Sequence, residues 1–363
     1  MKYCAIIQLE SIHEIITPGL IFSLNEIGFR PTLFINKGCS QRRGNIFDFC
    51  TELKFDLIEF SLKGDVSWDN VRYNIQTKNH EFLIINTLQK NDKLGLYLEF
   101  SLPIIGFVHN VNIFLESDDG IAFLNRNDTF FFTIAAHVSF YLRQQSKFDK
   151  TNIDYFIPAY LIRNSSIDRI NRFKEDGILR LAIAGGVNNL KNRGFAELLA
   201  FLKSSSNNLN VKFVICGGGN DRLELEERVT KYDLNQYFDF VPVEPHTGFV
   251  TYNNYYHALY ESDFLLTLFP PSDIKYFKYK GTASIMTAIS LQLPIITDIA
   301  ARNIYGITCM SYESDNLSSL FSLLSGVDKE AYSQEVANIQ DIQKSCRLRC
   351  TQTMKLATNY ILN

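Results

Sequence analysis

The chain has 363 residues, of which 46% are hydrophobic and 21% are charged, and its formal net charge is −3. This balance excludes a largely disordered chain, and the length exceeds that at which a single hydrophobic core usually stops growing, so we expect two domains. The slightly negative charge offers no general attraction for nucleic acid, and no apolar run is long enough to cross a bilayer.

The first residues, MKYCAIIQLESIHE, lack the long apolar segment and the small-residue cleavage site of a secretory signal. Seven cysteines, an odd number, suit reduced thiols better than a disulfide framework. We therefore expect a cytoplasmic protein. Cys346 and Cys350 lie four residues apart, but no second pair completes a zinc set, and no metal site is predicted.

The first part of the chain alternates short β-rich runs with helical patterns, which predicts parallel strands joined by crossover helices. Ile16, Leu20, Leu24 and Ile27 share one helical face, and Gly28 is suited to end that helix. For residues 129–143 the composition favours a strand and the length favours a buried helix, so both readings stay open. The expected strands are 2–9, 31–36, 56–62, 82–88, 103–111 and 155–162.

Residues 162–177 are polar and predict the linker between domains. A second alternation follows it. Its expected strands are 179–184, 211–216, 238–243, 264–269 and 294–297, and its expected helices are 195–202, 221–231, 252–260 and 282–291. We therefore predict an α/β protein with two tandem Rossmann-like, doubly wound domains facing a cleft, 1–162 and 163–339, and a C-terminal helix, 340–363, that packs back on the first domain.

Gly185 and Gly186 directly follow the expected strand at 179–184, and Lys191 and Arg193 follow before the next helix. Ligands of open parallel sheets bind at this end of the strands, where backbone N–H groups and the helix dipole attract a diphosphate. A turn that needs glycine only for tight packing is the alternative. The chain has neither a GxGxxG nor a GxxxxGK[ST] motif, so no dinucleotide cofactor and no P-loop are predicted.

A second anion-binding candidate comprises Lys280, Gly281, Thr282 and Ser284, at the start of the helix expected at 282–291. Thr282 is suited to cap that helix or to bind a phosphate oxygen. A capped helix with a solvated basic approach is the alternative. Two such helix starts in one domain favour a shared phosphate ligand.

The second half carries, in order, a strand with a Gly-Gly turn, KNRGFAELL, VICGGG, FDFVPV, YESDFLLTLFP and GTASIMTAISLQLPII. This run, 179–296, resembles the donor-binding domain of GT-B glycosyltransferases. The resemblance implies a nucleotide-sugar donor and makes Val243 and Glu244 candidates for backbone contacts to its base. Many retaining members carry two glutamates where this chain has Tyr279 and Thr287, so that subgroup is not indicated.

The opening ESIHEIITPGLIFSLNEIGFRPTLFIN also resembles GT-B enzymes, in which a histidine or an acid after the first strand faces the cleft. Transfer with inversion requires a base for the acceptor hydroxyl, and Glu10, His13 and Glu14 are the candidates, with His13 or Glu14 favoured. A polar loop residue and a helix start are the alternatives. His109 follows the run PIIGFV, and we expect it to contact the sugar or the departing phosphate unless it is a bonded loop residue.

These features predict a glycosyltransferase, of a kind used in polysaccharide biosynthesis, that moves a sugar from a nucleotide-sugar to a saccharide or glycolipid-type acceptor hydroxyl. No cofactor or metal is expected, because Lys191, Arg193 and Lys280 would stabilise the leaving phosphate. A nucleotide-sugar epimerase or a phosphorylase of the same fold is the alternative. A non-catalytic nucleotide-binding protein is another; it predicts nucleotide binding without turnover, and it is favoured if His13, Glu14 and His109 all point away from the cleft. Aromatic stretches such as NNYYH leave open a peripheral contact with the inner face of the membrane.

Overall fold

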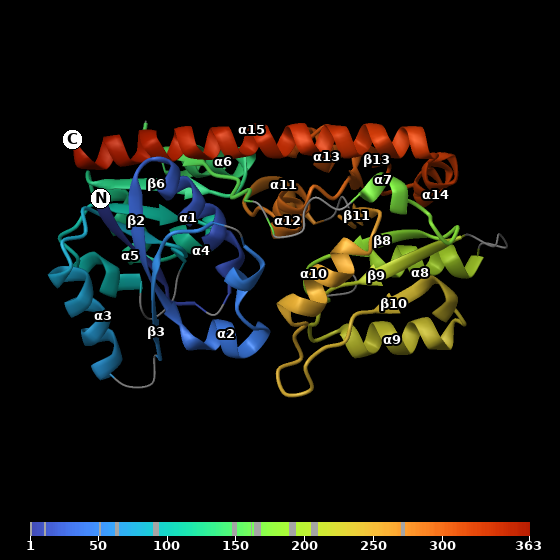
Figure 1. Ribbon diagram of the computed structural model, residues 1–363, viewed down its shortest axis with the longest axis horizontal. Helices are drawn as coiled ribbons and strands as arrows, with labels where there is room; N and C mark the ends of the chain where they lie inside the picture. Colours follow the sequence, from blue (N-terminus) through green and yellow to red (C-terminus); the bar gives the residue numbers. More distant parts are fainter. Residues whose placement is uncertain are drawn as a thin grey trace.

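The computed structural model describes residues 2–10, 12–50, 52–61, 65–89, 94–146, 151–160, 162, 168–188, 194–204, 210–269 and 273–363. Within these residues the chain forms two β-sheets of seven and six strands, and every strand pair is parallel. Helices flank both sheets, and the two sheets lie side by side along the molecule (Figure 1). The predicted α/β architecture is confirmed.

The first domain contains the seven-stranded sheet, in the order β3-β2-β1-β4-β5-β6-β7. The order reverses between β1 and β4, and in such sheets the loops at this switch point leave a crevice at the carboxyl ends of the strands. The strands are β1 Lys2–Gln8, β2 Phe29–Asn36, β3 Asp56–Phe60, β4 Leu83–Ile85, β5 Ile104–Phe107, β6 Thr129–Thr133 and β7 Ile153–Tyr155.

The helices of the first domain follow from local signals in the sequence. The one expected around Ile16 to Ile27 is α1, which has Pro18 in its first turn, and Gly28 follows it with a φ of 88° that glycine adopts readily. Residues 129–143 contain both alternatives, because a fully buried strand, β6, is followed by a helix, α6. The helices are α1 Thr17–Glu26, α2 Lys37–Arg43, α3 Asp65–Thr77, α4 Val111–Leu115, α5 Asp118–Asn125 and α6 Ala136–Gln145.

The second domain contains the six-stranded sheet, in the order β10-β9-β8-β11-β12-β13, with its switch point between β8 and β11. All five predicted strands are present, mostly shorter than predicted, whereas β13 was not predicted. The strands are β8 Leu179–Ile183, β9 Val211–Ile215, β10 Phe238–Phe240, β11 Phe264–Leu266, β12 Ile295–Asp298 and β13 Met310–Tyr312. The helices are α7 Arg169–Arg172, α8 Phe195–Ser204, α9 Arg222–Lys231, α10 Tyr252–Tyr260, α11 Ile274–Lys278, α12 Ala283–Leu291, α13 Ile299–Tyr305 and α14 Leu317–Gly326.

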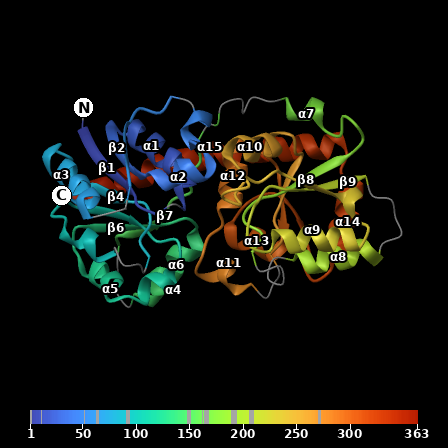
Figure 2. The ribbon, with the colours of Figure 1, turned by 90° about the horizontal axis from the view of Figure 1, so that it is seen from below.

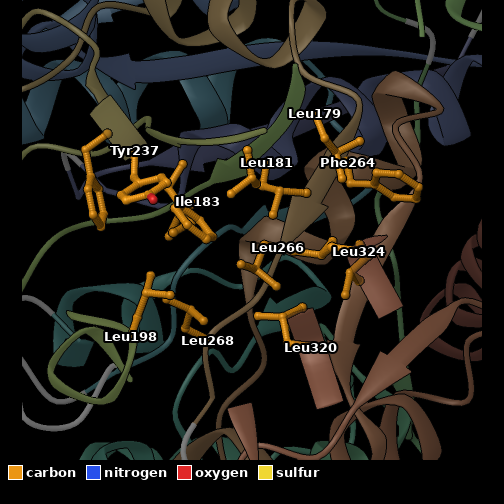
Figure 3. Close-up of a cluster of buried hydrophobic side chains, with 14 of the residues drawn as sticks. Leu179, Leu181, Ile183, Leu198, Tyr237, Phe264, Leu266, Leu268, Leu320 and Leu324 are labelled. Carbon is orange, nitrogen blue, oxygen red and sulfur yellow. The ribbon is translucent and has the colours of Figure 1, made fainter. Parts of the chain in front are cut away.

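Burial on both faces explains why the strands of this sheet have almost continuously apolar sequences. Leu181 and Ile183 of β8 pack on one face with Leu266 of β11, Leu198 of α8 and Leu320 of α14 (Figure 3). Ala182 and Ala184 belong to the core on the opposite face, with α10 and α12. A parallel sheet covered by helices on both faces needs this pattern.

A single helix, α15 (Lys329–Leu362), joins the two domains. It begins before residue 340, where the sequence analysis placed it, and Asp328 caps it by accepting a hydrogen bond from the backbone N–H of Ala331 at 2.8 Å. It packs against α7 and α12 of the second domain and against α1, β5 and β6 of the first (Figure 1, Figure 2). Within the expected linker, 162–177, residues 163–167 lie outside the described residues, and Arg169–Arg172 form the short helix α7. No described helix has the length and apolar content needed to span a bilayer.

Candidate functional site

A cavity of about 180 Å³ lies between the domains, where the carboxyl ends of β1 and β5 face the carboxyl end of β8 and the start of α12. It therefore lies next to the switch points of both sheets, where open α/β sheets bind ligands. The first domain lines it with His13, Ile15, Ile16, His109 and Ile134, and the second with Gly185, Tyr276, Lys280, Gly281, Thr282, Ala283, Ser284 and Met286.

His13 and His109 stack on each other in this cavity, with ring centroids 3.9 Å apart and ring planes 13° apart. They come from the loops after β1 and β5, and His13 has a left-handed backbone conformation, with a φ of 68°. Nε2 of His109 lies 2.7 Å from the backbone carbonyl oxygen of Asn86. Because a carbonyl only accepts hydrogen bonds, Nε2 carries the proton of neutral His109, and Nδ1 carries the lone pair.

Both histidines are uncharged at neutral pH. Burial lowers the pKa of His109 to about 4, helped by the positive charge of Lys280 and opposed by the bond to Asn86. Burial also lowers the pKa of His13 well below its ordinary value, and His109, Lys280 and Arg42 act in the same direction. A neutral imidazole offers a lone pair that is able to accept a proton or a hydrogen bond.

A buried amide network holds the loop that carries His13. The side-chain amide of Gln8 donates to the backbone oxygens of Glu10 at 2.5 Å and Ile12 at 2.7 Å. The amide of Asn86 donates to the side-chain oxygen of Gln8 and, at 3.2 Å, to the backbone oxygen of His13. Sequence reasoning missed both amides, although each directly ends or follows an apolar strand run, a position at which a polar side chain meets the crevice.

The second domain contributes the segment that contains Lys280 and Gly281. The backbone oxygen of Tyr279 accepts from the N–H of Val111 at 3.1 Å, which holds the segment against the first domain. A Cβ atom on Gly281 would lie 2.4 Å from Cγ1 of Ile134, so a larger residue does not fit there without rearrangement. Lys280 is half-buried, and no carboxylate of the described residues forms an ion pair with it, whereas nearby Lys275 pairs with Asp273 at 3.1 Å.

The start of α12 is capped as the sequence predicts. Thr282 accepts a hydrogen bond from the N–H of Ser284 at 3.3 Å. The Ser284 hydroxyl donates to the backbone oxygen of Ala184 at 3.1 Å, so it ties α12 to the end of β8. Ser284 therefore lines the cavity, but its hydroxyl proton already has a protein acceptor.

The glycine-rich turns have a packing role as well as a place at the cavity. Gly185 lines the cavity with a φ of 96°. A Cβ on Gly217 would lie 1.9 Å from the Gly185 carbonyl oxygen, and one on Gly186 would lie 2.8 Å from the amide nitrogen of Asn188. Gly186 is not part of the lining. Lys191 and Arg193, expected in the following loop, lie outside the described residues.

Glu14 has a different position from the one expected of a catalytic base. Its carboxylate is buried and accepts a hydrogen bond from the hydroxyl of Tyr252, in the second domain, at 2.7 Å, with Arg42 3.6 Å away. It does not line the cavity, because the short 3₁₀ turn after His13 directs it towards α10. Glu10 is also absent from the lining, and its backbone oxygen accepts from Gln8.

Val243 and Glu244, expected near a nucleotide base, lie beyond the end of β10 and do not line the cavity. The N–H of Glu244 donates to the oxygen of Phe249 at 2.8 Å, and its own oxygen accepts from Gly248 at 2.8 Å and from Thr247 at 3.2 Å. This turn uses both backbone groups of Glu244, so neither is open for the expected contact.

Among the described residues, no group of three or more His, Cys, Asp and Glu side chains is arranged to hold a metal ion. The described cysteines are all free thiols.

No protein-family model and no curated protein sequence matches the chain. Several solved structures have a similar fold. The fold is similar to HepE of Anabaena, solved with UDP and glucose, at 11% identity and a TM-score of 0.65, covering 99% of this chain and 100% of that one. It is also similar to WaaG, a glycosyltransferase involved in lipopolysaccharide biosynthesis, at 13% identity and a TM-score of 0.60, covering 97% and 99%. A glycosyltransferase from Rickettsia africae matches at 11% identity and a TM-score of 0.57, covering 100% and 96%. The chain has the GT-B fold, as its sequence predicts.

Proposed function

We propose that the protein is a glycosyltransferase that moves a sugar from a nucleotide-sugar donor to a hydroxyl of a saccharide or glycolipid-type acceptor. The observation that carries this proposal is the cavity in which two neutral histidines of one domain meet Lys280 and the start of α12 of the other. Sugar transfer needs a base for the acceptor hydroxyl and positive charge for the departing phosphate. The similarity to HepE, solved with UDP and glucose, supports a nucleotide-sugar donor.

The donor phosphate binds at the second-domain side of the cavity. Lys280 has no carboxylate partner among the described residues, so its charge is available to an anion. The nine-residue helix α12 starts at the same wall and directs the positive end of its dipole there. Since these groups supply the charge that stabilises the leaving phosphate, we propose that transfer needs no divalent metal and no cofactor.

His13 acts as the base. Its Nδ1 lies 3.3 Å from the Thr87 hydroxyl, and no described residue bonds its Nε2. Nε2 takes the proton of the acceptor hydroxyl while that oxygen bonds to the anomeric carbon; the bond from this carbon to the phosphate oxygen breaks, and its electron pair leaves with the phosphate. The anionic donor offsets the charge of Lys280, which raises the pKa of His13 towards the working range of a base.

His109 binds the donor sugar. Because its Nε2 proton is committed to Asn86, Nδ1 of the neutral ring accepts a hydrogen bond and has no proton to give to a phosphate. This favours a sugar hydroxyl, which donates, over the departing phosphate, the other partner considered for this histidine.

The observation that would favour the non-catalytic alternative is not made. That alternative would be favoured if His13, Glu14 and His109 all pointed away from the cleft, yet both histidines line the cavity and only Glu14 does not. The epimerase alternative is separated by incubating the protein with nucleotide sugars alone, since an epimerase changes the donor sugar without any acceptor.

A thermal-shift screen against UDP, GDP, CMP and their sugar derivatives tests the donor site. We expect selective stabilisation by one base; a ligand at 100 times its Kd adds about 2.7 kcal/mol to the free energy of unfolding. Product analysis with that donor and a panel of saccharide and glycolipid acceptors, with and without EDTA, then tests transfer and its independence of metal. Failure of every nucleotide to stabilise the protein at millimolar concentration contradicts the proposal.

A further inference from the structure

The two stacked histidines share a second feature, which is that the same short segment bonds a ring nitrogen of each. Asn86 and Thr87 directly follow β4, the strand between β1 and β5 that carry the two histidine loops. The backbone oxygen of Asn86 bonds Nε2 of His109 at 2.7 Å, and the hydroxyl of Thr87 lies 3.3 Å from Nδ1 of His13.

This segment is rigid enough to set the state of both rings. Asn86 is fully buried and Thr87 almost so. The ladder continues through the segment on both sides, because the N–H of Asn86 donates to Ile7 in β1 at 3.1 Å and the N–H of Leu88 donates to Phe107 in β5 at 2.7 Å. A hydrogen-bond partner held this firmly fixes which nitrogen of a neutral imidazole carries the proton.

For His13 the direction of the bond follows from charge. If the Thr87 hydroxyl donated to Nδ1, the proton of the neutral ring would sit on Nε2. Lys280 lines the same cavity as His13, and its positive charge acts on the His13 ring. An N–H dipole and an ammonium group repel each other, whereas a lone pair is attracted to the ammonium. The favoured arrangement has Nδ1–H donating to Thr87, with the lone pair on Nε2.

We propose that Thr87 is a positioning residue that holds His13 in the Nδ1–H tautomer, so that its Nε2 lone pair faces the acceptor hydroxyl. The catalytic consequence rests on the proposed function of His13, but the tautomer itself does not. Asn86 has the complementary effect on His109, so both rings present a lone pair to the cavity.

Nitrogen-15 NMR of the histidine side chains tests the tautomers directly, because protonated and unprotonated ring nitrogens differ widely in chemical shift. The chain has six histidines, and the spectra of His13→Gln and His109→Gln assign the two signals. At pH 7.5 we expect Nδ1–H for His13 and Nε2–H for His109. Nε2–H for His13 in the wild-type protein overturns the proposal.

Two substitutions at Thr87 give a matched pair. Thr87→Val keeps the shape and removes the hydroxyl, and we expect His13 to shift towards Nε2–H and kcat to fall by about 10- to 100-fold, with the donor KM within about twofold. Thr87→Ser retains the hydroxyl and should preserve both the tautomer and most of kcat. If Thr87→Val fails to fold, the wild-type spectrum still decides.

The outcomes separate this inference from the proposed function. Unchanged tautomer and kcat in Thr87→Val overturn the positioning role of Thr87. The expected tautomers in a protein that transfers no sugar from any donor support the assignment of Thr87 and contradict the glycosyltransferase proposal.

Discussion

The two sheets share one strand order through their first six strands, yet their carboxyl edges carry opposite chemistry. The first sheet ends in buried amides, a threonine and two neutral histidines, so this side of the cavity acts through side-chain lone pairs. The second sheet ends in glycine turns, Lys280 and the capped start of α12, so that side acts through backbone geometry and positive charge. The same topology thus provides two crevices, and the residues after each strand decide which half of the proposed reaction each one would serve.

The sharpest test of this division is at His13. We expect His13→Ala to lower kcat by about 100-fold or more while the affinity for the donor nucleotide stays nearly the same, because the proposed base acts on the acceptor. Steady-state kinetics and calorimetry with the nucleotide measure the two quantities. Glu14→Gln is the control, since its carboxylate faces Tyr252 and should leave kcat within a few fold. Wild-type turnover in His13→Ala removes the first-domain loop from the mechanism.

The second test uses pH and the burial of His109. In the unfolded chain, His109 becomes protonated below about pH 6.5, whereas its pKa in the folded protein is about 4. Between these values the unfolded state binds more protons, so stability is lost as pH falls from 6.5 to 4, by about 3 kcal/mol from His109 alone. Urea unfolding at several pH values measures the slope, to which His13 adds in the same direction. A His109→Gln variant should show a shallower slope, and an unchanged slope contradicts the burial of a neutral ring.

The third test addresses the second-domain half. Lys280→Ala should weaken binding of the nucleoside diphosphate or monophosphate by about 1 to 3 kcal/mol, because a charge-assisted contact is lost. The control is Lys278→Ala, which removes an equal charge two residues away in the chain. Lys278 is exposed and does not line the cavity, so calorimetry should find the nucleotide affinity of this variant unchanged. Equal losses of nucleotide affinity in both variants would indicate a diffuse electrostatic attraction instead of a direct contact with Lys280.

The smallest expected effect concerns the bond that crosses between the domains. Tyr252→Phe removes only the hydroxyl that donates to buried Glu14, and hydrogen bonds to charged groups contribute about 1.5 to 3 kcal/mol. We expect thermal unfolding to show a loss near the lower end of that range, because Arg42 continues to face the carboxylate. Tyr255→Phe in the same helix removes a buried hydroxyl that bonds the neutral side chain of Thr287 instead of a carboxylate, and it serves as the comparison. A larger loss in Tyr255→Phe than in Tyr252→Phe would contradict the importance of the bond to Glu14.

The sequence predicted those parts of the structure that depend on neighbouring residues. The buried-strand run of β8, the helix near Tyr252 to Tyr260 and the glycine after α1 are local patterns, and each was found where it was predicted. Strand ends were less accurate. The sequence run beyond Phe240 is as apolar as a strand, but the structure ends β10 there, because pairing with β9 stops at Ile215.

The candidate site was predicted in part for the same reason. His13, His109, Gly185 and the segment Lys280–Ser284 follow strands or begin a helix, positions that a parallel sheet brings to one edge, and all of them line the cavity. Glu14 has the same local signal, yet its partner lies 238 residues away in the chain. Local pattern identified which residues reach the crevice, but not which way each side chain turns.

The sequence by itself therefore determined the two α/β domains and the loops that carry the candidate site residues, because periodicity, glycines and helix caps act over a few residues. The tertiary structure alone decided that His13 and His109 stack, that Asn86 and Thr87 bond them, and that Glu14 joins the domains. These contacts depend on the register of β1, β4 and β5 and on the packing of the second domain against the first, and no short-range pattern encodes either.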